Sequence, residues 1–235
     1  MNNFLNSIPP IVKNLIGINI VLWLASIVLP EIFARSGIQL DLTDILGMHY
    51  WASSKFNPAQ LLTYMFMHGG FEHLLFNMFA LYMFGAVLEQ FWGAKRFLIY
   101  YIVTGVGAGI VQQLFWTVEY HSTIAAINEA IGNYPLQAIE LIEQKRSFLN
   151  MPITVGASGS VFGLLLAFGW LFPETRLLLL FFPVPIKARI FVLIYGVAEL
   201  LLGVAQFSGD SVAHFAHLGG MLFGAILILL WKKYK

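Results

Sequence analysis

Six long apolar stretches separated by polar segments constrain the fold of this chain more than any other feature. Backbone polar groups inside lipid must be satisfied within the chain, so a stretch of this kind crosses a membrane as an α-helix. Hydropathy predicts spans at residues 11–34, 71–92, 96–118, 157–172, 188–207 and 212–231. We therefore predict an all-α membrane protein, a bundle of six transmembrane helices in one domain over residues 1–235.

The composition agrees with lipid as the solvent for most of the chain. Hydrophobic residues make up 59% and charged residues 11%, and the mean hydropathy is +0.77, whereas soluble domains are about 25% charged. A formal net charge of +1 without a long basic run gives no electrostatic footprint for nucleic acid. The lack of cysteine excludes disulfides, thiol catalysis and thiolate metal sites. We expect the lipid bilayer as a partner, and neither nucleic acid nor a cofactor.

The basic residues predict the orientation of the spans. One side of the predicted bundle carries most of them: Lys13, Lys95, Arg96, Arg176, Lys187, Arg189, Lys232, Lys233 and Lys235. The other side carries Arg35, Lys55, Lys145 and Arg146. Because the side richer in Lys and Arg is usually cytoplasmic, and an even number of spans returns the chain to its starting side, both termini are expected in the cytoplasm.

The connections between the predicted spans differ in character. Residues 36–70 are apolar and aromatic, which predicts a loop that lies in the outer membrane interface. Residues 119–153 have a helix-like apolar period interrupted at Gly132 and Pro135, so two short surface helices are expected. The apolar run 177–185 is too short to cross and contains two prolines, which predicts an extended segment at the cytoplasmic surface.

The fourth span is unusually short. Residues 157–172 would form a helix of about 24 Å, less than the roughly 30 Å of a hydrocarbon core. Its outer end should stop below the membrane surface, so Gly156 and Ser158 are expected at the bottom of a depression. Irregular backbone at that depth is tolerated where it lines a water-filled cavity. The free N–H groups at the start of this helix could stabilise an oxyanion.

Small residues should let the fourth and sixth spans pack closely. Gly159-xxx-Gly163 and Gly220-xxx-Gly224 both have the small-xxx-small spacing that permits backbone contact. His217 lies three residues before Gly220, on the same face of the sixth helix. Ser158 and His217 could therefore meet across this interface, and serine with histidine is the minimal nucleophile and base pair for acyl transfer.

The second span contributes two further polar groups. His73 and Asn77 are four residues apart and share one face of a helix whose neighbouring positions are apolar. Polar residues within membrane spans are costly and are often functional. Both side chains can donate hydrogen bonds to a developing oxyanion.

These motifs, taken together and in order, resemble the rhomboid intramembrane serine proteases. The resemblance covers nearly the whole chain from Phe56 to Trp231 and rests on three segments: His73-Leu-Leu-Phe-Asn77, Gly156-Ala-Ser158-Gly and Ala216-His217-Leu-Gly-Gly220-Met-Leu-Phe-Gly224. No single motif is diagnostic, but the ordered set in the second, fourth and sixth of six spans is very specific.

The resemblance implies a serine endopeptidase that cleaves transmembrane or membrane-adjacent segments of other proteins. It implies that Ser158 is the nucleophile and His217 the general base, and that His73 and Asn77 stabilise the oxyanion. It also implies a Ser-His dyad without a carboxylate, and a bacterial cytoplasmic membrane as the location. The sequence is compatible with a dyad, because the nearest acid in the sixth segment, Asp210, lies two helical turns from His217.

Two features depart from the family pattern. The family often has a Trp-Arg pair in the first outer loop, and the comparable stretch here, residues 57–63, has none, so that anchoring role is not carried over. A tyrosine commonly follows the serine by four positions and stacks on the base. This chain has Phe162, which should keep the ring packing and lose the hydroxyl contact.

Several alternatives compete with these assignments. His214 could be the base, but the Gly-Gly pair after His217 favours His217. Glu89 and Glu199, at or within spans, are expected to make structural hydrogen bonds, and Glu199 has no obvious partner in the sequence. The sequence lacks a His-Glu-x-x-His motif, so no metal site is expected. A catalytically silent rhomboid-like binding or escort protein is the main alternative function. A transporter is disfavoured because no internal repeat is evident.

Overall fold

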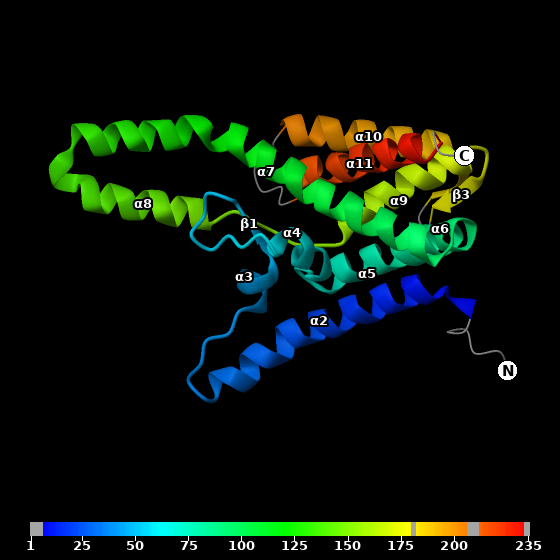
Figure 1. Ribbon diagram of the computed structural model, residues 1–235, viewed down its shortest axis with the longest axis horizontal. Coiled ribbons are helices and arrows are strands. Elements are labelled where there is room, and N and C mark those ends of the chain that lie inside the picture. Colours follow the sequence, from blue (N-terminus) through cyan, green and yellow to red (C-terminus); the bar gives the residue numbers. More distant parts are fainter. Residues whose placement is uncertain (1–6, 180–181, 206–211, 233–235) are drawn as a thin grey trace.

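The computed structural model describes residues 7–179, 182–205 and 212–232, and Figure 1 shows a bundle of helices. Within these residues five helices are long and apolar enough to cross a membrane, and a sixth, shorter helix is also apolar. They are α2 (Pro10–Ala34), the helix Phe71–Trp92, α7 (Ala94–Asn133), α9 (Ser158–Leu171), α10 (Ala188–Ala205) and α11 (His214–Lys232). The predicted helical membrane bundle with a short fourth span is confirmed.

The second span changes its helical geometry in the middle. It consists of α5 (Phe71–Ala80), a π-helical turn η2 (Leu81–Gly85) and α6 (Ala86–Trp92). It ends at Gly93, whose φ of 79° lies in the left-handed region that favours glycine. The chain then enters α7 directly.

The first span is tied to the end of the second by a buried carboxylate. Glu89 accepts hydrogen bonds from the backbone N–H groups of Ile11 and Val12, at 2.9 and 2.8 Å. These N–H groups lie in the first turn of α2, where no intrahelical acceptor is available. Glu89 thus makes the structural hydrogen bonds that were predicted for it. In Figure 1, α2 begins and α11 ends at the same end of the bundle.

The third span is much longer than predicted. Helix α7 has 40 residues and a length of about 60 Å at 1.5 Å per residue, about twice the thickness of a hydrocarbon core. The helix ends at Asn133, next to the predicted break at Pro135, whereas Gly132 lies inside α7. The short helix η3 (Pro135–Gln137) and α8 (Ala138–Asn150) follow. The first of the two expected surface helices is wrong as a separate element, since no helix-breaking residue interrupts residues 119–131. Figure 1 shows α8 folding back beside α7.

The loop between the first two spans is built from short elements. They are α3 (Leu42–Leu46), β1 (Met48–His49), α4 (Gln60–Thr63) and η1 (Tyr64–Phe66), and β1 pairs antiparallel with β2 (Ile153–Thr154). The side chain of Gln113 on α7 donates to the His49 carbonyl at 2.7 Å and accepts from the Trp51 N–H at 2.8 Å. Gln60 accepts from the His49 N–H at 3.2 Å. Two glutamines therefore anchor this loop, which lacks the Trp-Arg pair.

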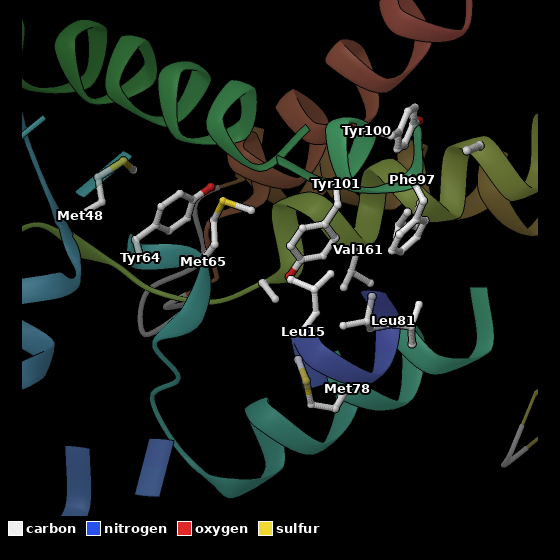
Figure 2. Close-up of a cluster of buried hydrophobic side chains, with 14 of the residues drawn as sticks. Leu15, Met48, Tyr64, Met65, Met78, Leu81, Phe97, Tyr100, Tyr101 and Val161 are labelled. Carbon is white, nitrogen blue, oxygen red and sulfur yellow. The ribbon is translucent and has the colours of Figure 1, made fainter. Parts of the chain in front are cut away.

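Several apolar side chains of this loop pack inside the protein. Tyr64, Met65 and Met67 are at most 1% exposed. Figure 2 shows Tyr64 and Met65 in the same cluster as Tyr101 of α7 and Leu15 of α2. These three side chains fill an apolar space between the helices, so they do not contact lipid, and the position of the loop at the membrane interface stays a prediction.

The connection between the fourth and fifth spans is extended, as predicted. Strand β3 (Arg176–Leu179) pairs antiparallel with β4 (Phe182–Lys187). Glu174, just before β3, forms ion pairs with Lys187 at 2.7 Å and Arg189 at 2.8 Å. These pairs join the two ends of the connection. Its position at the cytoplasmic surface stays a prediction.

Helices α9 and α11 approach until their backbones touch. A Cβ atom at Gly220 would collide with the backbone carbonyl of Gly159, and one at Gly224 would collide with the Tyr100 hydroxyl. That hydroxyl donates to the Gly163 carbonyl at 2.8 Å. The four glycines of the two small-xxx-small motifs thus lie in one crowded region shared by α7, α9 and α11. The predicted close packing is confirmed.

This contact predicts a strong effect of Gly220→Ala. The added methyl group meets backbone rather than a movable side chain, so the helices must separate, and overpacking typically costs about 1–3 kcal/mol. We expect a lower thermal unfolding midpoint in detergent. Gly132→Ala is the matched control, because no atom lies within 4 Å of its added Cβ and helical Gly-to-Ala changes are mildly stabilising. Equal midpoints for the Gly220→Ala variant and the unchanged protein would contradict this account.

Candidate active site

Ser158 and His217 form the centre of the site. Ser158 is the first residue of α9, and His217 lies in the first turn of α11. The Ser158 Oγ and His217 Nε2 atoms are 2.8 Å apart, within the hydrogen-bond distance predicted from the sequence. A hydroxyl in contact with an imidazole nitrogen is the arrangement in which histidine can take the proton as the oxygen attacks.

The ring of His217 is held on its face by Phe162. The two rings are stacked, with centroids 4.1 Å apart and an interplanar angle of 6°. Phe162 follows Ser158 by one turn of α9, so one helix supplies both the hydroxyl and the surface on which the imidazole rests. The predicted ring packing is confirmed.

A carboxylate accompanies the histidine, contrary to the expected dyad. Glu199 Oε2 on α10 lies 2.9 Å from His217 Nδ1 and 2.7 Å from His214 Nδ1. All three side chains are buried. The partner of Glu199 was missed because it lies in a separate helix, and the hydrophobic pattern of a span surrounded by lipid and protein does not fix which face points inward. The serine contact is made by His217 and the carboxylate contact by both histidines.

The same three residues bring together donor atoms that metal ions use. Glu199, His214 and His217 each offer one ligand atom, and these atoms lie within 4.8 Å of one another. Two histidines and a glutamate are a known ligand set for zinc. In the structure, hydrogen bonds to Glu199 Oε2 join the two histidines to the glutamate.

Gly156 brings the backbone close to His73. Its φ of 126° is one that residues with a side chain rarely adopt, and an added Cβ would lie 2.7 Å from His73 Nε2. The Gly156 N–H donates to the Tyr64 carbonyl at 2.9 Å, which fixes this conformation. His73 Nδ1 accepts from the Gly69 N–H at 3.4 Å. A neutral ring then carries its proton on Nε2, the nitrogen that faces the segment before Ser158.

Asn77 lies one turn after His73 and is also buried. Its Nδ2 atom donates to the His73 carbonyl at 2.8 Å, which uses one of its two N–H bonds. The predicted shared face of His73 and Asn77 is confirmed. Their role toward an oxyanion stays a prediction.

Two cavities meet at Ser158. One, of about 870 Å³, is lined by the start of α5, the strand β2, and the pair Ser158 and His217. The second, of about 410 Å³, is mainly apolar and lies between α5 and α10, with Asn77 and Phe162 beside Ser158 in its wall. The short α9, about 21 Å long for its 14 residues, leaves the space above Ser158 open. The nucleophile candidate is therefore accessible from two directions.

Comparison with known proteins identifies the family. Residues 55–234 match the rhomboid domain. The mitochondrial Rhomboid protein 1 of Saccharomyces cerevisiae is 33% identical over 161 residues, which cover 68% of this chain and 38% of the yeast protein. The chloroplastic Rhomboid-like protein 11 of Arabidopsis thaliana is 29% identical over 192 residues, covering 74% and 53% of the two chains. The putative rhomboid protease YdcA of Bacillus subtilis is 30% identical over 105 residues, covering 45% and 37%.

The fold and the match over most of its length define the class of this molecule, a multi-pass integral membrane protein. The chain belongs to the rhomboid family. It spans about half or less of the length of these relatives. The resemblance seen in the three sequence motifs is thereby confirmed.

His68, beside the site, predicts a loss of stability in acid. It is 4% exposed, its ring centroid is 5.1 Å from that of His73, and burial together with His73 lowers the pKa of His68 from 6.5 to about 4. Between these values the unfolded chain binds a proton that the folded chain does not, so stability falls as pH drops from about 6.5 to about 4, by at most about 3 kcal/mol.

His68→Leu should flatten this acid dependence. Thermal unfolding midpoints measured in detergent from pH 7 to pH 4 provide the test. His121→Leu, at an exposed position on α7, is the control and should retain the slope of the unchanged protein. Identical acid slopes for the His68→Leu variant and the unchanged protein would show that His68 does not carry the effect.

Proposed function

We propose that this protein is an intramembrane serine endopeptidase with Ser158 as nucleophile and His217 as general base. The observation that carries the proposal is the 2.8 Å contact between Ser158 Oγ and His217 Nε2 at the first residue of the short apolar helix α9. Membership of the rhomboid family supports it, since YdcA, one of the relatives, bears the name of a putative protease. A catalytically silent binding protein would have no need of this pair.

The chemistry follows from the positions of these atoms. Ser158 Oγ attacks the carbonyl carbon of the scissile peptide while its proton passes to His217 Nε2, which gives a tetrahedral intermediate. The intermediate collapses as the imidazolium returns that proton to the leaving amine, and an acyl ester on Ser158 remains. A water molecule, deprotonated by His217, then hydrolyses the ester and restores the Ser158 hydroxyl.

The negative oxygen of the intermediate requires donors on the side of Ser158 facing α5. His73 Nε2 lies close to Gly156, and Asn77 retains one N–H that is not used by its hydrogen bond to the His73 carbonyl. The start of α9 adds backbone N–H groups without intrahelical acceptors. Donors that are fixed before the reaction stabilise charge without reorganisation, and this is often the largest part of the rate enhancement.

The proposed substrates are transmembrane or membrane-adjacent segments of other proteins. The apolar cavity between α5 and α10 reaches Ser158 and suits an apolar segment, whereas the larger cavity beside His217 suits water. A substrate helix has its backbone bonds satisfied internally, so it must unwind locally before cleavage. The proposed location is a bacterial cytoplasmic membrane, with both termini in the cytoplasm.

Three alanine variants should differ in cleavage activity in a defined order. Ser158→Ala and His217→Ala should abolish cleavage of a purified transmembrane substrate, because the covalent step then lacks its nucleophile or base. Asn77→Ala should lower kcat by about 10²–10³ and leave residual activity, since other oxyanion donors remain. The thermal midpoint of Ser158→Ala should stay close to that of the unchanged protein. Full activity of folded Ser158→Ala would refute the protease assignment and favour the binding protein.

Entry between α5 and α10 predicts a selective effect of cross-linking. The chain has no cysteine, so Met83→Cys and Phe191→Cys introduce the only thiols, one on each side of the apolar cavity. Joining them with a bifunctional thiol reagent should block cleavage of a transmembrane substrate while a small fluorophosphonate still labels Ser158. The same protein before cross-linking is the control. Unchanged cleavage after complete cross-linking would show that substrates enter by another route.

A further inference from the structure

Glu199 is a buried acid in an apolar helix that the serine and histidine chemistry does not by itself require. It is 8% exposed, and its position on α10 is flanked by apolar residues. A carboxylate within a membrane span is costly unless its charge is compensated. Here two imidazole nitrogens, one from each histidine of α11, lie within 3 Å of a single oxygen, Oε2.

These contacts determine where the protons lie. An ionised carboxylate has only acceptors, so each histidine must carry its proton on Nδ1 to make its hydrogen bond. A neutral His217 is then left with a lone pair on Nε2, the nitrogen that lies 2.8 Å from Ser158 Oγ. This is the tautomer in which His217 can accept the serine proton.

We propose that Glu199 is a positioning residue that completes a Ser158–His217–Glu199 chain, with its carboxylate held in place by His214. The inference rests on the proposed protease function and deepens it. As the serine proton reaches His217, the imidazole becomes positive, and the nearby carboxylate stabilises that charge without taking the proton itself. Glu199 acts through His217 and touches no substrate atom.

The packing of α10 on α11 is built around this contact. Gly203 lies four residues after Glu199, on the same face of α10. A Cβ at Gly203 would lie 3.1 Å from the Cβ of His214 and 3.0 Å from the ring of Phe215. The missing side chain lets α11 come close enough for both histidines to reach one carboxylate. Phe162 stacks on the His217 ring and holds it in the plane in which Nδ1 faces Glu199 and Nε2 faces Ser158.

Glu199→Gln tests the proposal with little change in size. The amide lacks the charge, and its NH2 group can donate to His217 Nδ1, which moves the imidazole proton to Nε2 and removes the base. We expect kcat on a transmembrane substrate to fall by about 10²–10⁴, with KM within about threefold of the unchanged protein. The rate of Ser158 labelling by a fluorophosphonate should fall in parallel.

Glu89→Gln is the matched control. Glu89 is likewise a buried glutamate in a spanning helix, but its hydrogen bonds go to the first turn of α2. This variant should lower the thermal midpoint and leave kcat per folded molecule unchanged. If Glu199→Gln behaved in the same way, with lower stability and kcat within threefold of the unchanged protein, Glu199 would be structural and the proposal wrong.

His214→Leu, which removes the donor to Glu199, provides a second test if Glu199→Gln does not fold. Loss of one charge-assisted hydrogen bond to the carboxylate should lower kcat by about tenfold to a hundredfold, with KM unchanged. An unchanged kcat in this variant would overturn the role given to His214. Ser158→Ala distinguishes a failure of the positioning role from a failure of the protease function. An inactive Ser158→Ala together with a fully active Glu199→Gln would refute only the positioning role, whereas an active Ser158→Ala would refute the protease itself.

Discussion

The contact between the backbones of α9 and α11 is the constraint on which the site depends. Two glycines, Gly159 and Gly220, remove the side chains that would otherwise separate the helices. In lipid no hydrophobic force drives helices together, so close van der Waals contact between small residues does this work. At this separation the first turn of α11 lies over the start of α9. His217 therefore reaches Ser158, and a wider spacing of α9 and α11 would break the contact between these two side chains.

The short α9 makes this contact useful. A helix that spanned the full membrane would satisfy its own backbone and enclose Ser158, whereas α9 begins at Ser158 and is preceded by Gly156 in an unusual conformation. The left-handed φ of Gly156 brings the backbone close to His73, and the first N–H groups of α9 have no intrahelical acceptor because the helix begins there. Polar groups are thus gathered at one level of an otherwise apolar bundle.

Much of this could be predicted from the sequence, and the failures share a cause. The spans, the short fourth helix and the Ser158–His217 pair follow from hydropathy and from motifs within single helices. The contact of Glu199 with His217 does not, because it depends on the rotation of α10 relative to α11, which a helix apolar on most faces does not reveal. The burial of Tyr64 was missed for a related reason, and the length of α7 was missed because hydropathy marks the end of a membrane span and not the end of a helix. Hydropathy separates apolar from polar segments but does not distinguish contact with lipid from contact with protein.

The hairpin of α7 and α8 has a mechanical consequence for the site. Helix α8 ends at Asn150, and the chain reaches Ser158 only a short segment later. Along that segment Asn150 accepts hydrogen bonds from Ser53 and Ser54, and β2 is paired with β1. The segment that joins the hairpin to Ser158 is therefore held by the loop between the first two spans, so the position of Gly156 does not depend on α8 alone.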